Sequence, residues 1–509
     1  MTLRDRLLAA PLLVILSALS GVAMFLPAAH ATLTNMDQVA QSFFYSGLMV
    51  LIVTAMVWLA TSTWRPRNLA RSQLASLVGA YALMPVIFAV PVTQALPDTS
   101  FLNAWFEMVS CFTTTGASLY DTPGRLAPSL HLWRATVGWL GGLFILVTAT
   151  AILAPMNLGG VEVMSGRAPG RGGAAGLSQI TKVADPSQRF LRYTMVLFPI
   201  YSGLTLLLWL LLMIAGEVNL LALIHAMGTL STSGIGLDGD LSMLRTGLVG
   251  EVLIVLFLLL AVTRRFLPGA QSALMQGPLH RDPEVRLAAI VIATTTAVLF
   301  FRHFIGAIEV EATDDAASAL RALWGTFFMA VSFLTTTGYE SGEWAAARSW
   351  SGLPSPGLVL LGLAIIGGGV ATTAGGVKLL RVYALFRHGE RELEKLIHPS
   401  SIGGQGSQAR RLRREGAYFA WLFFMLFALS IAVSTAALSL MNLPFEDALV
   451  LTLAALSTTG QLADLAGSTP IRYAELDSAA KAFLAMVMVV GRLETLALLA
   501  LFAPSSWQR

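Results

Sequence analysis

Four short runs of hydroxyl residues, each ending in a glycine, are the part of this chain whose residue types and spacing could do chemistry. Each run places three consecutive Ser or Thr residues before its glycine, and the glycines follow one another at intervals of about 118, 104 and 122 residues. The runs are Thr113–Gly116, Ser231–Gly234, Thr335–Gly338 and Ser457–Gly460. Such recurrence indicates four diverged copies of one structural unit. We expect one chain to bring four equivalent loops to one axis.

A hydroxyl–glycine turn is suited to binding a dehydrated cation. Backbone carbonyls can replace the water shell of an ion where the chain leaves its helical hydrogen bonding. Glycine permits the dihedral angles that such a turn needs, and Ser or Thr hydroxyls can bond back to the loop and hold its carbonyls in place. A preceding helix that points its C-terminal end at the loop also favours a cation. The pattern therefore predicts a cation filter.

The residues before each run predict the elements that position it. Apolar residues stand four and seven positions before each glycine, and a small residue stands six before, which is helical spacing. In the first repeat these residues are Phe112, Val109 and Ser110. We expect short helices near 101–112, 218–230, 319–334 and 444–456, too brief to cross a bilayer.

Composition places these loops in a membrane protein. Of 509 residues 55% are hydrophobic and 12% charged, against roughly a quarter charged in a soluble domain. The predicted fold is an all-α polytopic membrane protein, with two leading helices and four repeats of span, pore helix, filter loop and span around one pore. The ten predicted spans are about 9–28, 43–61, 74–92, 134–154, 192–215, 247–267, 286–306, 356–385, 416–439 and 481–503.

The chain divides accordingly into 1–72 (leading helices), 73–160 (repeat 1), 161–270 (a loop and repeat 2), 271–398 (repeat 3) and 399–509 (repeat 4).

Loops on one side are basic, with Arg65, Arg67, Arg167, Arg171, Lys182 and the cluster 410–414, while the other side carries Asp98, Asp121, Asp238 and Asp240. Basic loops stay cytoplasmic, so both termini are predicted to be cytoplasmic and the filters to open outward. The glycine-rich stretches 157–190 and 403–406 are predicted to be cytoplasmic loops. The outer carboxylates either concentrate cations or only solvate their loops.

A glycine-rich interruption in the span 356–385 suggests a gate. The segment 367–377 contains five glycines within ten residues, and each disfavours a helix by about 1 kcal/mol relative to Ala. We expect it to lie directly below the filter as a movable plug. The alternative is a kinked helix that packs closely on its neighbour through small residues. The predicted gate residues are Gly367, Gly368, Gly369, Thr372, Thr373, Gly375, Gly376, Lys378 and Arg492.

Five charged or titratable residues within apolar segments need separate interpretation. Arg492 in the last span is predicted to face the pore and raise the barrier to cations; the alternative is that it extends to the cytoplasmic interface. Lys378 is either a gate element or a basic anchor at a helix end. Glu107 and His225 occupy matching positions in the first two pore helices and are predicted to brace the filter rather than bind ions. The single cysteine, Cys111, is predicted to pack beside a pore loop.

The chain resembles the Trk/Ktr/HKT superfamily of potassium transporters, and most of all the bacterial Trk-type potassium-uptake membrane subunits. The resemblance covers essentially the whole chain. It rests on the following motifs: Phe106-Glu107 before Phe112–Ala117, Trp139–Gly142, Thr335–Tyr339, Gly367–Lys378 and Gly491–Glu494.

This resemblance implies a homodimer in the bacterial inner membrane, with a pore in each subunit, and a cytosolic ring of nucleotide-binding regulatory subunits as partner. It implies K⁺ as the bound and transported ion, with no organic cofactor and no nucleic acid. The residues that it assigns to the filter are Thr114, Thr115, Gly116, Thr232, Ser233, Gly234, Thr336, Thr337, Gly338, Thr458, Thr459 and Gly460. Gln461-Leu462 after the fourth glycine and Ile235-Gly236 after the second depart from the family pattern, which puts strict preference for potassium over sodium in question.

Other functions remain open from the residues alone. A sodium/potassium or proton-coupled cation symporter of relaxed selectivity would use the same loops. A permease for an organic solute also uses broken helices, but its repeats are usually inverted. An intramembrane enzyme is disfavoured because no nucleophile–base pair or metal-ligand cluster stands on neighbouring spans, and a receptor or scaffold would not need four such loops.

Overall fold

The computed structural model describes residues 11–61, 69–120, 122–156, 158–160, 163, 186–237, 241, 244–266, 278–306, 316–353, 355–398, 414–467 and 469–494. Within these residues the regular elements are helices, with no β-strand. The predicted all-α class is therefore confirmed. Most of the predicted loop 157–190, all of 403–406, both chain ends, Arg65, Arg67, Asp121, Asp238 and Asp240 lie outside the described residues.

The helices follow the predicted repeat order. The leading segment contains α2 (Leu12–Ala23), α3 (Phe25–Leu33) and α4 (Asp37–Thr61). Repeat 1 contains α5 (Leu69–Ala95), α6 (Phe101–Phe112) and α7 (Pro128–Thr148), and repeat 2 contains α10 (Pro186–Ile214), α11 (Asn219–Leu230) and α12 (Leu248–Leu258). Repeat 3 contains α13 (Pro283–Gly306), α14 (Ala316–Leu334), α15 (Trp344–Ser351), α16 (Gly357–Ile366) and α17 (Leu379–Ile397). Repeat 4 contains α18 (Arg414–Leu440), α19 (Phe445–Ser457), α20 (Leu462–Leu465) and α21 (Ser478–Leu493).

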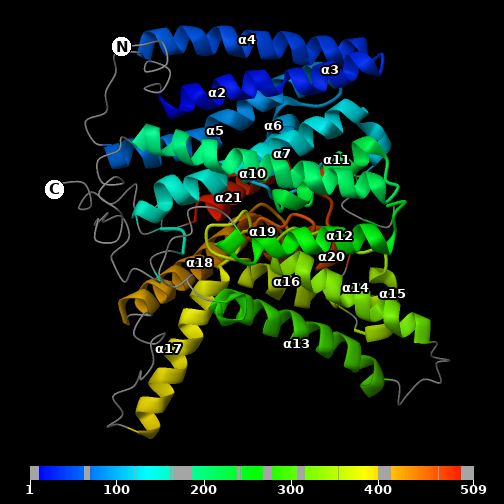
Figure 1. Ribbon diagram of the computed structural model, residues 1–509, viewed down its shortest axis with the longest axis vertical. Helices are drawn as coiled ribbons and strands as arrows, with labels where there is room; N and C mark the ends of the chain where they lie inside the picture. Colours follow the sequence, from blue (N-terminus) through cyan, green and yellow to red (C-terminus); the bar gives the residue numbers. More distant parts are fainter. Residues whose placement is uncertain are drawn as a thin grey trace.

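The four repeats close into a ring through their pore helices α6, α11, α14 and α19. In each repeat the first span packs on its own pore helix, in the pairs α5–α6, α10–α11, α13–α14 and α18–α19. The second span packs on the pore helix of the next repeat, in the pairs α7–α11, α12–α14, α16–α19 and, to close the ring, α21–α6. The leading helices pack on repeat 1, with α4 at the edge of the molecule, and α17 projects from the bundle (Figure 1).

Helix lengths refine the predicted spans. Among the described residues eight helices are long and apolar enough to cross a membrane, and seven of them coincide with predicted spans. The eighth is α14, which was predicted as a short pore helix but begins at Ala316. The predicted spans 247–267, 356–385 and 481–503 overlap the shorter helices α12, α16 and α21. The α16 segment is short because its helix ends where the glycines begin.

Candidate ion pathway

All four hydroxyl–glycine runs adopt the same sharp turn at the end of their pore helix. The middle hydroxyl residue is left-handed in every copy, with φ of 55° at Thr114, 50° at Thr232, 56° at Thr336 and 57° at Thr458. A β-branched residue rarely adopts positive φ, because its side chain crowds the backbone there. The same costly conformation at the same position in four copies is typical of a built site rather than of four independent loops.

Hydroxyl groups hold these turns together. The first hydroxyl of each run donates to the carbonyl four residues earlier in its pore helix, at 2.7 to 2.9 Å between oxygens. The backbone N–H of the third hydroxyl residue donates to the carbonyl of the small residue six positions before the glycine, at 2.9 to 3.0 Å. The second bond satisfies a carbonyl near the end of the helix, whereas the hydroxyl shares a carbonyl that already accepts the N–H of its own residue. Both bonds give a physical reason for the hydroxyl and small-residue positions that recur in the sequence.

The four loops lie side by side around one axis. A Cβ atom added to each filter glycine would contact or overlap an atom of the next loop, in the order of the repeats and back to the first. The pairs are Gly116 with Ser233, Gly234 with Thr337, Gly338 with Thr459 and Gly460 with Ala117. The structure therefore brings the twelve predicted filter residues together in one ring.

The fourth loop differs from the other three. Gly116, Gly234 and Gly338 have positive φ of 73°, 58° and 81°, whereas Gly460 does not. The Gly460 N–H donates to the carbonyl of Thr115 in the first loop at 2.6 Å. Its own carbonyl accepts a hydrogen bond from the Tyr473 hydroxyl at 2.9 Å. The departure flagged in the sequence at this loop thus coincides with a change in the backbone.

The glycine-rich segment after α16 folds into a compact loop rather than a kinked helix. The helix ends at Ile366, and Gly367 has φ of 73°. The chain then returns, so that the N–H groups of Val377 and Lys378 donate to the carbonyls of Ile365 and Ile366, both at 2.9 Å. A new helix, α17, begins at Leu379. Backbone groups of the loop are thus satisfied partly by the end of α16 and partly by other segments, such as the Ala261 carbonyl that accepts the Gly369 N–H at 3.0 Å, as an interrupted helix within an apolar span requires.

This loop contacts the filter at the end formed by the first two hydroxyl residues of each run, which we call the hydroxyl end. The Gly375 N–H donates to the hydroxyl of Thr336 at 2.7 Å, and the Thr373 hydroxyl donates to the carbonyl of Leu230 at the end of α11, at 3.3 Å. A Cβ on Gly375 would overlap the carbonyl of Ser457. The loop therefore lies against repeats 2, 3 and 4.

Basic side chains surround the far side of the loop. Lys378 donates to the carbonyl of Ala374, and Arg381 pairs with Glu494 at 2.6 Å. Arg492 is 4% exposed, which rules out its extension to the interface in this structure. Arg492, Lys378 and the loop line a cavity of about 20 Å³, which has room for about one water molecule. The space next to the filter is therefore nearly closed.

A comparison with known families decides what kind of protein this ring belongs to. The sequence profile of TrkH, described as a cation transport protein, matches residues 39–509. The chain belongs to the TrkH family. This confirms the resemblance predicted from the sequence, and it makes the chain a transport protein rather than an enzyme.

Individual relatives agree with the TrkH assignment over nearly the whole chain. The chain is 28% identical over 495 residues to the Trk system potassium uptake protein TrkH of Salmonella typhimurium, with 95% of this chain and 96% of the relative covered. It is 28% identical over 491 residues to the Trk system potassium uptake protein TrkI of Halomonas elongata, with 92% and 91% covered. The crystal structure of the potassium transporter TrkH from Vibrio parahaemolyticus matches with a TM-score of 0.78 at 23% identity and covers all of both chains. That likeness shows a shared fold.

In this TrkH-family chain Glu107 contacts the first filter loop from behind. Its carboxylate accepts the N–H of Leu119 at 2.9 Å and pairs with the Arg134 guanidinium at 2.7 Å, and both charged side chains are buried. These contacts fit the predicted bracing role. His225 is also buried; its Nδ1 has no hydrogen-bond partner among the described residues, and its ring packs edge-on against Tyr339 at 5.6 Å. Its ring therefore packs on Tyr339, the residue that follows the third filter glycine.

We expect Glu107→Gln to lower the free energy of unfolding by about 3 kcal/mol, because it leaves the Arg134 charge buried without its carboxylate. Thermal unfolding in detergent, followed by loss of monodisperse protein, measures the effect. Asp98→Asn is the matched control, since Asp98 pairs with Arg125 at 3.1 Å on the surface with 65% of its side chain exposed. Equal melting temperatures for the two variants would contradict the bracing role.

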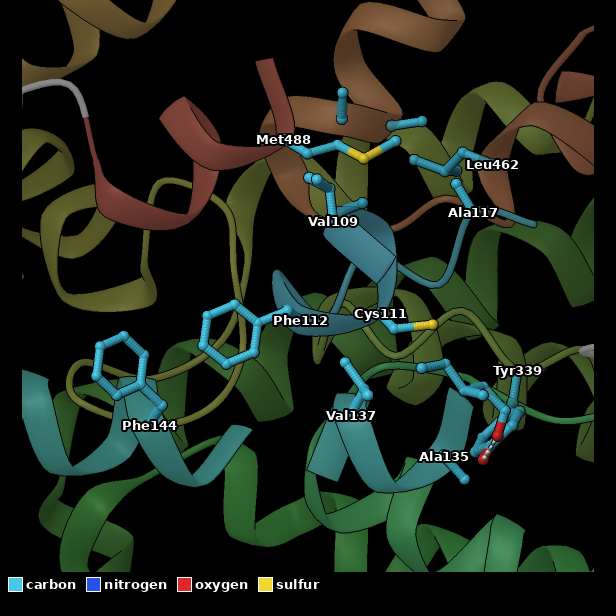
Figure 2. Close-up of a cluster of buried hydrophobic side chains, with 14 of the residues drawn as sticks. Val109, Cys111, Phe112, Ala117, Ala135, Val137, Phe144, Tyr339, Leu462 and Met488 are labelled. Carbon is cyan, nitrogen blue, oxygen red and sulfur yellow. Dashed lines mark hydrogen bonds between the residues drawn. The ribbon is translucent and has the colours of Figure 1, made fainter. Parts of the chain in front are cut away.

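Cys111 lies in the apolar packing behind the first loop, as predicted. Figure 2 shows it on the same helix as Val109 and Phe112, close to Val137 of α7. The ring of Phe112 stacks on that of Phe144 with centroids 5.6 Å apart. Cys111 is fully buried, so packing accounts for it.

Sequence reasoning missed several carboxylates that hold loops in place. Glu284 at the start of α13 accepts the N–H of Val370 in the glycine-rich loop at 2.8 Å. Glu251 in α12 accepts from Gly342 and Ser341, just after the third filter, both at 2.8 Å. A carboxylate within or beside an apolar span is the signal that could have found them, since burial requires a partner.

Proposed function

We propose that this chain takes up potassium across the bacterial inner membrane through a filter formed by its four hydroxyl–glycine loops. The observation that carries the proposal is the closed ring of four loops with the same left-handed turn in each. Relatives named as potassium uptake proteins over more than nine-tenths of the chain support K⁺ as the transported ion. Carbonyls of the twelve predicted residues from Thr114 to Gly460 would replace the water shell of K⁺.

The loop between α16 and α17 is the gate in this proposal. Its contact between Gly375 and Thr336 closes the hydroxyl end of the filter, and the cavity beyond it is about 20 Å³. Conduction would require the loop to withdraw from Thr336 and Leu230. Lys378 and Arg492 would oppose a cation on the same path, because like charges repel strongly where water is scarce.

The wider assembly follows from the same proposal. We infer a homodimer with one pore in each subunit, filters opening outward and both termini in the cytoplasm. The relatives are named as parts of a Trk system, which supports a cytosolic nucleotide-binding subunit as the regulatory partner. We propose the basic segments 264–286 and 387–414 as its docking sites. Residues 267–277 and 399–413 lie outside the described residues, and Arg387 and Lys395 of α17 have 46% and 43% of their side chains exposed.

Ion flux into liposomes tests the proposed function. With purified protein and an imposed potential, we expect potassium and rubidium to enter at least about tenfold faster than sodium or lithium, the discrimination that about 1.4 kcal/mol of preferential binding provides. Protein-free liposomes are the control for leak. Equal sodium flux would favour a cation pathway of relaxed selectivity, and the absence of flux even with the regulatory subunit added would contradict the proposal.

A further inference from the structure

The side chain of Gln461 lies inside the ring of filter loops, at the end formed by the four glycines, which we call the glycine end. Its Nε2 is 3.1 Å from the carbonyl oxygen of Gly234, 3.3 Å from that of Ser233 and 3.4 Å from that of Gly116. A Cβ on Gly338 would overlap its Oε1. One carboxamide therefore touches the other three filter loops.

The carboxamide presents hydrogen-bond donors to the carbonyls that a cation would use. A primary amide has two N–H donors, and here three carbonyl oxygens converge on its nitrogen. The reverse orientation would place Oε1 against the same three oxygens, so the network itself fixes which atom is the nitrogen. Oε1 is buried without a hydrogen-bond partner among the described residues. The group thus stands where positive charge is favoured.

The rest of the fourth loop also presents donors to its neighbours. The Gly460 N–H bonds the Thr115 carbonyl at 2.6 Å, and the Thr459 hydroxyl approaches the Thr336 carbonyl at 3.5 Å. Its own carbonyls are already bonded, that of Thr459 to the N–H of Leu462 at 3.2 Å and that of Gly460 to Tyr473. In this arrangement the fourth loop donates to carbonyls of the first and third loops, and its own Thr459 and Gly460 carbonyls are already bonded.

We propose that the Gln461 carboxamide is a tethered competitor that occupies the outermost cation position, so that a cation binds there only when this side chain swings away. The inference rests on the proposed function and makes Gln461 a determinant of apparent cation affinity. The bonds to Nε2 are at the long end for N–H···O contacts, and Gln461 is only half-buried. Both features suit an occupant that an ion can displace.

Cation-dependent stabilisation tests the inference without requiring an open gate. Melting temperatures of the purified protein would be measured in detergent over a range of KCl and NaCl concentrations at constant ionic strength. For Gln461→Ala the potassium concentration that gives half of the maximal stabilisation should fall about tenfold, as expected when two or three weak hydrogen bonds no longer compete. Gln461→Asn should act in the same direction, because its carboxamide is one methylene shorter.

Gln94→Ala is the matched control, because this glutamine bonds only Ser46 at 3.2 Å among the described contacts, on α5 away from the filter. A half-maximal concentration for Gln461→Ala within about twofold of the unaltered protein, less than 0.5 kcal/mol, would overturn the inference alone. A higher concentration would also overturn it, because Gln461 would then be a ligand of the ion. If no variant responds to potassium more than to sodium, the potassium filter itself fails, and the inference fails with it.

Discussion

Gly116→Ala is expected to reduce potassium flux by about 100-fold. The added methyl group would overlap the carbonyl oxygen of Ser233 in the next loop, and φ at Gly116 is 73°. A left-handed alanine costs about 1–2 kcal/mol, and overpacking adds about 1–3 kcal/mol. The loops must then move apart, and about 3 kcal/mol lost from ion binding corresponds to about 100-fold. Flux of potassium or rubidium into liposomes at a fixed protein-to-lipid ratio measures the change.

Gly203→Ala is the matched control for this experiment. Gly203 lies in α10, and a Cβ there would meet no atom within 4 Å. The potassium flux of the Gly203→Ala variant should therefore equal that of the unaltered protein. Gly234→Ala should resemble Gly116→Ala, because its methyl group would overlap the Thr337 carbonyl oxygen. Unaltered flux in both filter variants, with melting temperatures unchanged, would show that ions do not pass between these loops.

The repeat architecture was predictable because local chemistry determines it. A pore helix followed by three hydroxyl residues ends in the same way in each copy, with the first hydroxyl bonding the carbonyl four residues back. Those bonds join residues only a few positions apart, so the residue types that make them recur at a fixed spacing in the sequence. Five glycines in one apolar span likewise exclude a continuous helix wherever they occur.

The parts that sequence reasoning missed depend on contacts between distant segments. Arg381 and Glu494 are 113 positions apart and pair at 2.6 Å. Gln461 reaches Gly116, which is 345 positions away. The placement of Gln461 also depends on the backbone of Gly460, which lacks the positive φ of the other three filter glycines. No local spacing encodes either contact, although the sequence did mark the fourth loop as unusual.

The buried charge beside the glycine-rich loop is positive on balance, with three basic side chains against the carboxylates of Glu494 and Glu284. Lys378, Arg381 and Arg492 are all buried there. Glu494 pairs with Arg381, at 2.6 Å, and lines the same small cavity as Arg492. The Nε atom and one terminal nitrogen of Arg492 have no hydrogen-bond partner among the described residues. In the proposed pathway this buried guanidinium beside the glycine-rich loop would be an electrostatic obstacle to a cation that leaves the filter.

Arg492→Ala is therefore expected to raise potassium flux about 30-fold. At an effective dielectric constant of about 20, a positive charge about 8 Å from the path of a monovalent cation opposes it by about 2 kcal/mol, which is about 30-fold in rate. Single-channel or liposome flux recordings under one imposed potential measure it. Arg492→Lys keeps the charge and should stay near the unaltered protein, as should Arg125→Ala, whose side chain pairs with Asp98 on the surface. A rise in both Arg492 variants would assign the effect to guanidinium contacts with the loop, and no rise in Arg492→Ala would remove this residue from the barrier.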